Sequence, residues 1–411
     1  MLKPLKQILA LSTSNIAGPL VIFIATPEIS KTYTPESFGE FTFYFGIIPI
    51  LTILFSGLMF HGIIKEENTQ KALLFFAAAK KITLAALTIA TTILFITSLT
   101  LKIKTSEILL TLLIAYTGTQ IQLFNVLFSR FGSIKQIVKT TIIRAIIVVA
   151  LQIIFGKLYS HHNSLLLGYL ISEAIVILLN SRHTKKTLPH QRKTSIKPNK
   201  INYYIKKNLL FFKYYAPSQI ISTATNFIPV ITMHSLGSLA NLGAYGIILR
   251  LYGTPIYSIA NAIRSIYWRW ISENNISAKR ISSPIAASGY TLVFAFSILS
   301  FSLNIKPASL VLSPEWHFID NYFTPYLCYF SLSFLNTFLT EALKNSNKQR
   351  TLLISEALGL PIKALIILVP LLCFDFQDVL LLTAISGIAF NSLATLYYLS
   401  AIKELPHQNA P

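Results

Sequence analysis

Residues 378–403 read DVLLLTAISGIAFNSLATLYYLSAIK, and this stretch decides the class of fold. No charged residue lies between Asp378 and Lys403. About 20 consecutive, mostly apolar residues in a helix span the hydrocarbon core of a bilayer, which is about 30 Å thick. The stretch is therefore predicted to be a transmembrane helix with an acidic residue at one end and a basic residue at the other.

The same pattern recurs along the whole chain. Hydrophobic residues make up 53% of the sequence and charged residues 12%, against roughly 25% charged residues in a soluble domain. The predicted fold class is all-α, a polytopic membrane protein with twelve transmembrane helices. The predicted spans, with ends good to several residues, are 8–27, 41–60, 80–100, 107–128, 140–157, 164–180, 214–235, 242–263, 285–304, 322–341, 352–372 and 379–400.

The lysine and arginine residues gather on one side of these spans. If successive loops alternate sides, 28 of the 35 lie on one side, 5 lie on the other, and the remaining two lie within spans. Lys71, Lys80 and Lys81, for example, are assigned to the loop between the second and third spans. Because basic loops are retained in the cytoplasm, and because Lys3 and Lys403 share the basic side, both termini are predicted to be cytoplasmic.

Composition and motifs also exclude several functions. A net charge of +20 would suit nucleic acid, but the basic residues lie in short loops and do not gather on one soluble face. Membrane lipids are therefore the expected partners of these loops, and no nucleic acid is expected. The sequence has no phosphate-binding glycine loop, no nucleophile elbow and no metal-ligand spacing of His, Cys and Asp. We expect no metal, no cofactor and no enzymatic activity.

A basic stretch near the midpoint divides the chain. Residues 181–213 carry ten lysine and arginine residues and no acid, and their end mixes aromatic residues with lysines. The sequence predicts a six-helix lobe at 1–180, a basic cytoplasmic linker at 181–213 and a second six-helix lobe at 214–411. The end of the linker is read either as an interfacial helix that steers the two lobes or as a segment that simply adheres to headgroups.

The two halves show a faint internal repeat. A shift of 204 residues places residues 38–41, FGEF, on residues 242–245, LGAY. A shift of 213 residues places SIKQ at 133–136 on SNKQ at 346–349. Since a shift of six spans keeps the orientation in the membrane, the lobes are predicted to be related by a parallel pseudo-two-fold along the membrane normal.

Charged residues within spans are the first candidates for function. Each costs about 2.5–3.5 kcal/mol on insertion scales, so each needs a partner or a wet cavity. Arg250 and Lys363 suggest a cationic cavity for an anionic substrate. The alternative is structural, with either cation neutralising Glu173 or Glu356 inside the bundle. Those two acids are candidates for proton coupling, ligand contact or charge pairing.

Two further residues are weaker candidates for substrate contact. Arg144 lies close to the inner end of its span, so it either contacts substrate or extends its side chain to the interface. Asn15 ends a polar cluster, STSN at 12–15, in the first span. This cluster either lines a cavity or forms hydrogen bonds between helices.

Several motifs, taken in order, resemble a known family. Residues 33–41, YTPESFGEF, resemble the first outer loop of the polysaccharide flippases. The resemblance continues through residues 236–245, LGSLANLGAY, then Leu249-Arg250-Leu251 and Pro255, and on to residues 263–267, IRSIY, and 312–316, LSPEW. The chain resembles the Wzx-like flippases of the multidrug/oligosaccharidyl-lipid/polysaccharide exporter superfamily. It departs from them at residues 59–62, MFHG, where the family often has Arg-Tyr-Glu, so that gate element is not carried over.

The resemblance implies a specific transport function. Such flippases have two six-helix lobes around a central cavity and work by alternating access. Their substrate is an undecaprenyl-pyrophosphate-linked oligosaccharide, which crosses the bacterial cytoplasmic (inner) membrane for O-antigen, lipopolysaccharide or capsule assembly. Candidate protein partners are a glycan polymerase and its chain-length machinery. Arg250 matches a basic position in the family's eighth span and Lys363 one in its eleventh, so both are expected to contact the pyrophosphate.

Two rival functions stay open on the sequence alone. The nearer rival is a cation-coupled drug or metabolite exporter of the same superfamily, with Glu173 as the coupling acid. The other is a membrane glycan polymerase or ligase. Those enzymes usually need a sizeable outer loop, whereas the longest predicted loop here is on the inner side.

Overall fold

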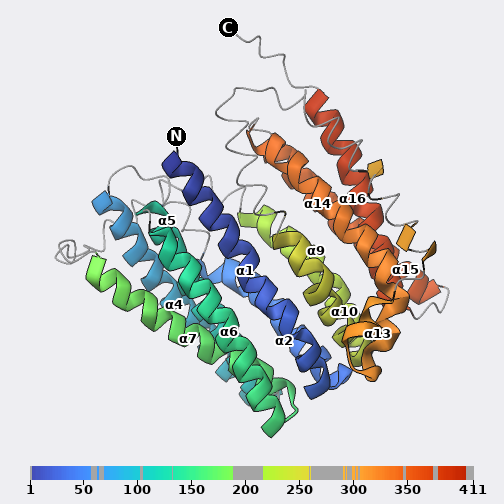
Figure 1. The fold of residues 1–411 in the computed structure, drawn as a ribbon, viewed down its shortest axis with the longest axis horizontal. Coiled ribbons are helices and arrows are strands. Elements are labelled where there is room, and N and C mark those ends of the chain that lie inside the picture. The colour runs from blue at the N-terminus through green and yellow to red at the C-terminus, as the bar shows by residue number, and fades with distance from the viewer. Residues whose placement is uncertain are drawn as a thin grey trace. The chain divides into compact units, whose positions relative to one another are not determined.

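The computed structural model describes residues 2–56, 69–101, 105–131, 133–187, 216–258, 306–345, 349–373 and 378–403, with isolated positions between these ranges. The described residues form helices and short connections, and none of them forms a β-strand. The predicted all-α membrane fold is confirmed (Figure 1).

The described helices of the first half of the chain each correspond to one predicted span. Proline inside α1 and α2 does not end these helices, as is common where neighbouring helices surround the freed backbone groups. The helices are α1 (Leu2–Thr32), α2 (Pro35–Ser56), α4 (Thr69–Leu101), α5 (Thr105–Arg130), α6 (Ile134–Leu158) and α7 (His162–Thr187).

Helix α4 begins earlier than predicted. Lys71, Lys80 and Lys81 were expected in a loop, but all three lie inside this helix, so that part of the prediction was wrong. The Nζ atom of Lys80 lies 5.6 Å from the ring centroid of Phe76 and 4.9 Å from that of Phe124. Because ring faces attract a cation, these rings accommodate the charge of Lys80 within the bundle. The apolar residues 72–79 then extend the helix toward its N-terminus.

In the second half, the long described helices also correspond to predicted spans, whereas two short helices at 307–311 and 314–322 lie between spans. The predicted span at 285–304 lies almost entirely outside the described residues, as does the linker beyond Thr187, where α7 ends. The elements are α9 (Ala216–Ser235), α10 (Leu239–Ile248), the π-helix η3 (Leu249–Gly253), α13 (Pro307–Val311), the 3-10 helix η4 (Pro314–Tyr322), α14 (Phe323–Asn345), α15 (Gln349–Cys373) and α16 (Val379–Lys403).

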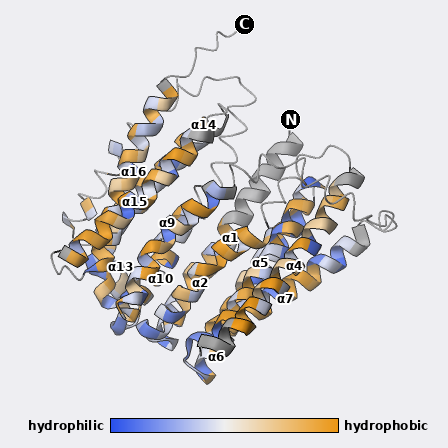
Figure 2. Cartoon of the chain, turned by 180° about the vertical axis from the view of Figure 1, so that it is seen from behind, coloured by the Kyte–Doolittle hydropathy of each residue, from blue (hydrophilic) through white to orange (hydrophobic). Residues whose placement is uncertain are grey.

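The surfaces of the helices fit a membrane. Large apolar side chains such as Ile89, Phe95 and Leu365 are exposed, and the bodies of the helices are mostly hydrophobic (Figure 2). Seven of the described helices contain a segment long and apolar enough to cross a bilayer: Pro35–Ser56, Ala72–Ile96, Thr105–Arg130, Ile134–Leu158, His162–Thr184, Thr351–Leu372 and Val379–Ile402.

Packing divides the chain into two compact units. One unit is residues 40–223, in which α7 packs on both α5 and α6, and α4 packs on α5. The other combines residues 1–39 with residues 224–411, and in it α16 packs on both α14 and α15. By this criterion α1 groups with the second half, through contacts with η3. The two six-helix lobes at 1–180 and 214–411, which were inferred from the internal repeat, remain a prediction.

The start of α2 and the start of α10 meet backbone to backbone. A Cβ atom on Gly39 would overlap the carbonyl of Leu239, and a Cβ atom on Gly243 would overlap the carbonyl of Pro35. Pro35 and Leu239 are 204 residues apart, as are Gly39 and Gly243. The contact is therefore reciprocal, which is the arrangement expected where repeat-related residues lie about a local two-fold axis.

This contact predicts that neither glycine tolerates a side chain. Gly39→Ala and Gly243→Ala should each lower the thermal unfolding midpoint of the protein in detergent, because forcing backbones apart costs about 1–3 kcal/mol. Gly118→Ala in α5 is the control, since its Cβ would meet the nearest neighbouring atom at an ordinary 3.6 Å. Unfolding midpoints equal to that of the unmodified protein would contradict the close approach.

Candidate functional site

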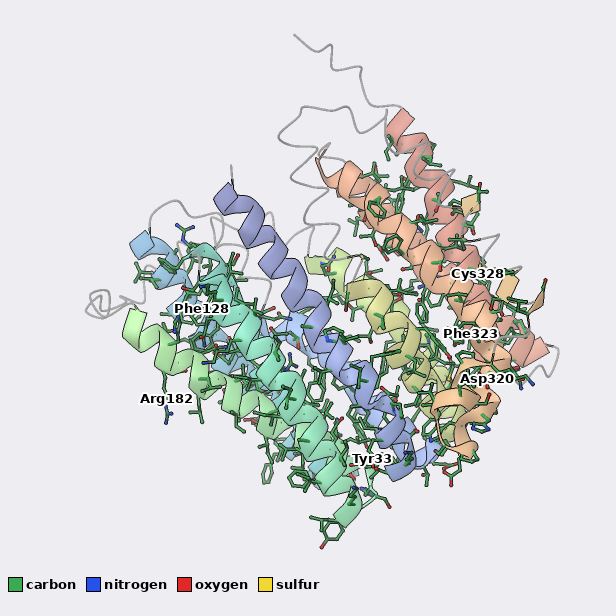
Figure 3. The ribbon with its side chains drawn as sticks, in the orientation of Figure 1. Tyr33, Phe128, Arg182, Asp320, Phe323 and Cys328 are labelled. Carbon is green, nitrogen blue, oxygen red and sulfur yellow. The ribbon has the colours of Figure 1, made fainter. Side chains whose placement is uncertain are left out.

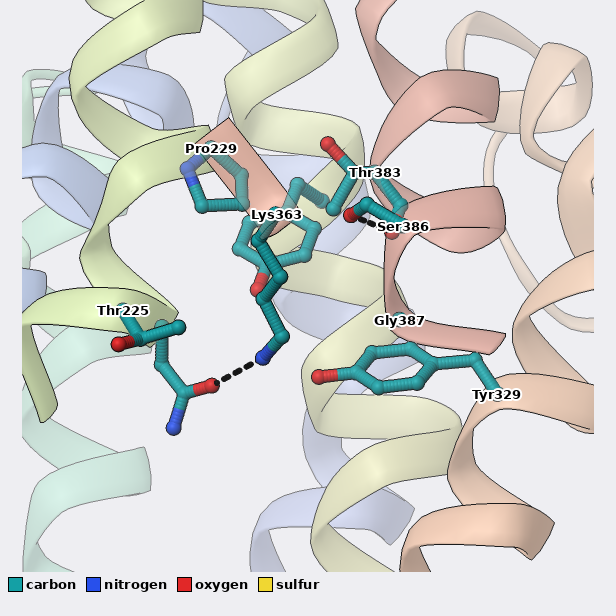
Figure 4. A pocket seen from close by; sticks show the side chains of 9 residues that line it. Thr225, Pro229, Tyr329, Lys363, Thr383, Ser386 and Gly387 are labelled. Carbon is teal, nitrogen blue, oxygen red and sulfur yellow. Dashed lines mark hydrogen bonds between the residues drawn. The ribbon is translucent and has the colours of Figure 1, made fainter. Parts of the chain in front are cut away.

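A small pocket surrounds Lys363 in the unit formed by residues 1–39 and 224–411. Lys363 is only 5% exposed, and its Nζ atom donates a hydrogen bond of 3.1 Å to Oδ1 of Asn226 (Figure 4). The cavity beside its ammonium group has a volume of only about 10 Å³, which is room for about one water molecule, and the side chain of Asn226 is exposed. The other lining residues come from four further helices: Thr225 and Pro229 in α9, Tyr245 in α10, Tyr329 in α14, and Thr383, Ser386 and Gly387 in α16.

Two glycines allow aromatic rings to form part of this site. A Cβ atom on Gly387 would overlap the ring of Tyr329, and a Cβ atom on Gly359 would overlap the ring of Phe390. The Nζ atom of Lys363 lies 4.7 Å from the centroid of the Phe390 ring. The glycines therefore let one ring lie against α16 and another lie beneath the ammonium group.

The charge of Lys363 is stabilised mainly by neutral groups. Its direct contacts are the amide oxygen of Asn226 and the ring of Phe390, and Glu356, one of the sequence candidates, adds an electrostatic attraction from the same helix. Among the described residues, no carboxylate forms a contact ion pair with Lys363. A buried cation held in this way can still attract an anion, because a contact carboxylate does not already neutralise it.

Arg250 lies in the π-helical turn η3. The N–H group of Thr254 bonds to the carbonyl of Leu249, five residues back, and its Oγ1 atom donates to the same oxygen at 2.8 Å. Pro255 follows and has no N–H group to donate. Single π-helical turns inside α-helices occur frequently at functional sites. The turn was not predicted from the sequence, although Pro255 beside Arg250 was a local signal for it.

The guanidinium of Arg250 lies over a buried aromatic pair. Its Cζ atom is 4.7 Å from the centroid of the Phe38 ring. Phe38 in turn meets Trp316 edge to face, with centroids 5.9 Å apart, and both rings are almost fully buried. The Trp316 indole N–H donates to the carbonyl of Ser30 at 3.0 Å, and the Ser313 hydroxyl donates to the same oxygen at 2.7 Å.

Three of the motifs that carry the family resemblance therefore meet around Arg250. They come from residues 33–41, 249–251 and 312–316, which are far apart in the sequence. The sequence placed them in order along the chain, but it did not show that they are in contact. Tyr33, which begins the first of these motifs and is labelled in Figure 3, is also buried.

Arg144 and Glu173 form an ion pair within the unit of residues 40–223. Glu173 is 1% exposed, and it also accepts a hydrogen bond of 2.5 Å from the Thr117 hydroxyl. The guanidinium of Arg144 lies 5.2 Å from the centroid of the Tyr169 ring. From the sequence, Arg250 or Lys363 was one candidate partner for Glu173. The partner observed in the structure is Arg144.

The predicted site residues are thus distributed over several environments. Arg250 is not among the residues that line the Lys363 pocket, and Arg144 pairs with Glu173 in the other unit. Asn15 lies in α1, but its side chain is outside the described residues.

Some residues of the Lys363 pocket had no signal in the sequence. Asn226, Thr383 and Ser386 are ordinary polar residues within apolar spans, and neither spacing nor charge distinguishes them. Tyr245 did lie in a motif of the family resemblance, but no role was assigned to it. The pocket could be recognised only once the helices were placed around Lys363.

Comparison with solved structures identifies the fold. A lipid II flippase, MurJ, in an inward closed conformation superposes with a TM-score of 0.71 at 14% identity, covering 98% of this chain and 88% of that chain. A multidrug resistance MATE family transporter of the MOP superfamily, in an outward-facing conformation, has a TM-score of 0.62 at 15% identity, covering 98% and 97%. A MOP superfamily transporter from Pyrococcus furiosus has a TM-score of 0.58 at 12% identity, with the same coverage.

No protein-family model matches the chain, and no curated protein matches its sequence. The structural similarity extends over nearly the whole length of each partner, at identities that establish the fold alone. The chain therefore has the fold of the transporters of the MOP superfamily, the multidrug/oligosaccharidyl-lipid/polysaccharide exporters, and is a multi-pass membrane protein.

Proposed function

We propose that this protein is a flippase for lipid-linked oligosaccharides. It moves undecaprenyl-pyrophosphate-linked repeat units from the cytoplasmic to the periplasmic leaflet of the inner membrane, for assembly of O-antigen or capsule. Both chain termini lie in the cytoplasm, and a glycan polymerase with its chain-length machinery receives the product. The observation that carries the proposal is the Lys363 pocket, in which a buried ammonium group faces polar and aromatic side chains.

The chemistry of the pocket suits an anionic sugar-bearing head group. An oligosaccharide pyrophosphate cannot enter hydrocarbon, because its hydroxyls and phosphates would lose water without replacement hydrogen bonds. Lys363 would attract the pyrophosphate, whereas Thr225, Thr383 and Ser386 offer hydroxyl groups to its polar atoms. Tyr329 adds an aromatic face with a polar end, which suits contact with a sugar ring.

The size of the pocket bears on how transport proceeds. Its cavity volume of about 10 Å³ is far below the 300–1,000 Å³ usual for sites that enclose a drug-sized ligand. A water molecule would fit in such a space, whereas neither a phosphate group nor a whole oligosaccharide head group would. Transport therefore requires a more open state, in which the pocket widens and the lipid tail remains in the bilayer, as alternating access provides.

The remaining candidates receive supporting roles in this proposal. Arg250 contacts the pyrophosphate in the open state, once its guanidinium leaves the face of Phe38. Arg144 and Glu173 act as a charge pair that either contacts the head group or responds to a coupling ion. Asn15 and Glu356 lie along the path of the substrate, where Glu356 adds a weaker electrostatic attraction to Lys363 without neutralising it.

The rival exporter function makes a different demand on the site. A pocket for cationic drugs would carry a carboxylate available to the ligand, whereas Glu173 already engages Arg144 and Thr117. Loss of surface glycan without drug sensitivity in a deletion strain separates the flippase from the exporter. Lipid-linked single repeats that accumulate facing the cytoplasm, and not outward, separate it from a polymerase.

Lys363 should be needed for transport rather than for folding. Lys363→Met keeps the length of the side chain and removes its charge, so the rate at which liposomes containing the purified protein flip an undecaprenyl-pyrophosphate oligosaccharide should fall at least tenfold. Lys363→Arg should retain part of that rate, and Lys306→Ala, at an exposed loop position, should retain all of it. A Lys363→Met variant that flips at the normal rate would refute the role of the pocket.

Arg250 should be equally necessary in the cell. Arg250→Ala should abolish surface polysaccharide while the amount of protein in the membrane stays normal, because the variant removes a cation that the pyrophosphate requires. Arg182→Ala is the matched control, since Arg182 is exposed and its side chain points away from the neighbouring helices (Figure 3). Immunoblots of glycan and of protein give both readouts, and full surface polysaccharide in the Arg250→Ala strain would rule out the assignment.

A further inference from the structure

Two histidines and two glutamates gather at one end of the unit formed by residues 40–223. Glu40 lies near the start of α2, Glu107 in the first turn of α5, and His161 and His162 at the start of α7. The side chains of His162 and Glu107 are 2% and 8% exposed, that of Glu40 is 29% exposed, and His161 is exposed. None of these residues belongs to the Lys363 pocket.

The imidazole of His162 lies between the two carboxylates. Its Nδ1 atom contacts Oε2 of Glu40, and its Nε2 atom lies 3.7 Å from Oε1 of Glu107. The ring of His161 is beside it, with centroids 4.0 Å apart. Glu40, His161 and His162 can each offer one ligand atom, and these three atoms all lie within 4.8 Å of one another.

We propose that Glu40, His161 and His162 bind one divalent transition-metal ion of the zinc type. Two imidazole nitrogens and one carboxylate oxygen are a donor set that Zn²⁺ accepts, with water completing the coordination. Ligand atoms around a tetrahedral zinc are roughly 3.3 Å apart, given metal–ligand distances of about 2.0–2.1 Å. To reach that spacing, the exposed His161 side chain must move toward the other two ligands and the contact between His162 and Glu40 must widen.

Glu107 fits the supporting role in such a site. A histidine that binds a metal through one nitrogen commonly directs its other N–H group at a carboxylate, which fixes the orientation of the ring. Glu107 is placed beside Nε2 of His162, and its own carboxylate is oriented by a hydrogen bond of 2.7 Å from the Ser106 hydroxyl. Tyr44 stacks on the same imidazole, with centroids 5.9 Å apart and planes 22° apart.

A second imidazole distinguishes this arrangement from a purely structural ion pair. A protonated His162 held between Glu40 and Glu107 would need no further partner. His161 nevertheless lies next to it, with its Nδ1 atom 3.4 Å from the backbone N–H of Asn163. The positive ends of the helices disfavour a bound cation, and the two carboxylates oppose that effect.

The sequence could not indicate this site, and our expectation of no metal came from the absence of a recognisable ligand spacing. His161 and His162 are adjacent in the sequence, but Glu40 is more than a hundred residues away. The bound ion would join α2 to α7 within one unit. It would therefore stabilise that unit without taking part in the transport chemistry proposed for Lys363.

Metal binding by the purified full-length chain tests the site. The protein is prepared in detergent without a histidine tag, stripped with a chelator and titrated with Zn²⁺, with Mg²⁺ in parallel. We expect one Zn²⁺ per chain by elemental analysis, a higher thermal unfolding midpoint with Zn²⁺, and no comparable effect of Mg²⁺. Because His161 is exposed, His161→Ala should fold normally and bind Zn²⁺ at least tenfold more weakly.

Two further variants make the result decisive. Glu40→Gln should weaken binding as His161→Ala does, since it also removes one ligand. His234→Ala, at an exposed position at the end of α9, should bind Zn²⁺ like the unmodified chain. Absence of stoichiometric Zn²⁺ in the unmodified protein, or equal Zn²⁺ affinity in His161→Ala, would overturn the proposal.

Discussion

The cost of placing charge among membrane helices governs this structure, and three cations within the helices are accommodated in three different ways. Arg144 pairs with the carboxylate of Glu173. Arg250 lies over the ring of Phe38, in a π-helical turn. Lys363 is held by an amide oxygen and the ring of Phe390.

Since removing a charge from water costs several kcal/mol unless it finds a partner, the kind of partner that each cation has is informative about its role. An arginine that already has a carboxylate partner is explained by structure alone. A lysine held mainly by neutral groups remains able to attract an anion, and for this reason we place the substrate at Lys363.

A second constraint is the reciprocal contact between Gly39 and Gly243. Each glycine admits a carbonyl oxygen that a side chain would displace, so the backbones at the starts of α2 and α10 are in direct contact. This contact lies beside the cluster of Phe38, Trp316 and Arg250, because Phe38 precedes Gly39.

A transporter that alternates between states must break some contacts and keep others. Contacts made by glycine and buried aromatic rings depend on shape, so they are expected to form or separate as a unit and not to deform gradually.

Much of the fold could be predicted from the sequence, because a membrane imposes a simple requirement on every span. Long apolar segments located the described helices, and the 204-residue repeat identified Gly39 and Gly243 as equivalent positions, although it did not predict that they are in contact. Lys80 shows where this reasoning fails: charge alone suggested a loop, but the rings of Phe76 and Phe124 accommodate its charge within a helix.

The candidate site was less predictable. The charged residues within spans could be singled out from the sequence, but their partners depend on which helix faces which. Asn226 beside Lys363 and Arg144 beside Glu173 are contacts between segments distant in the sequence, which composition and periodicity do not encode.

The central claim is that the chain carries a lipid-linked anionic glycan through its membrane. The most direct measurement is reconstitution of the purified protein into liposomes that hold a fluorescent undecaprenyl-pyrophosphate oligosaccharide, followed by quenching of the label exposed in the outer leaflet. The account predicts that label initially protected in the inner leaflet becomes accessible at a rate that depends on the amount of protein. It also predicts that a neutral lipid-linked sugar without pyrophosphate is moved far more slowly. If the label stays protected while the same liposomes transport a cationic drug, the flippase account is wrong, and the fold serves an exporter instead.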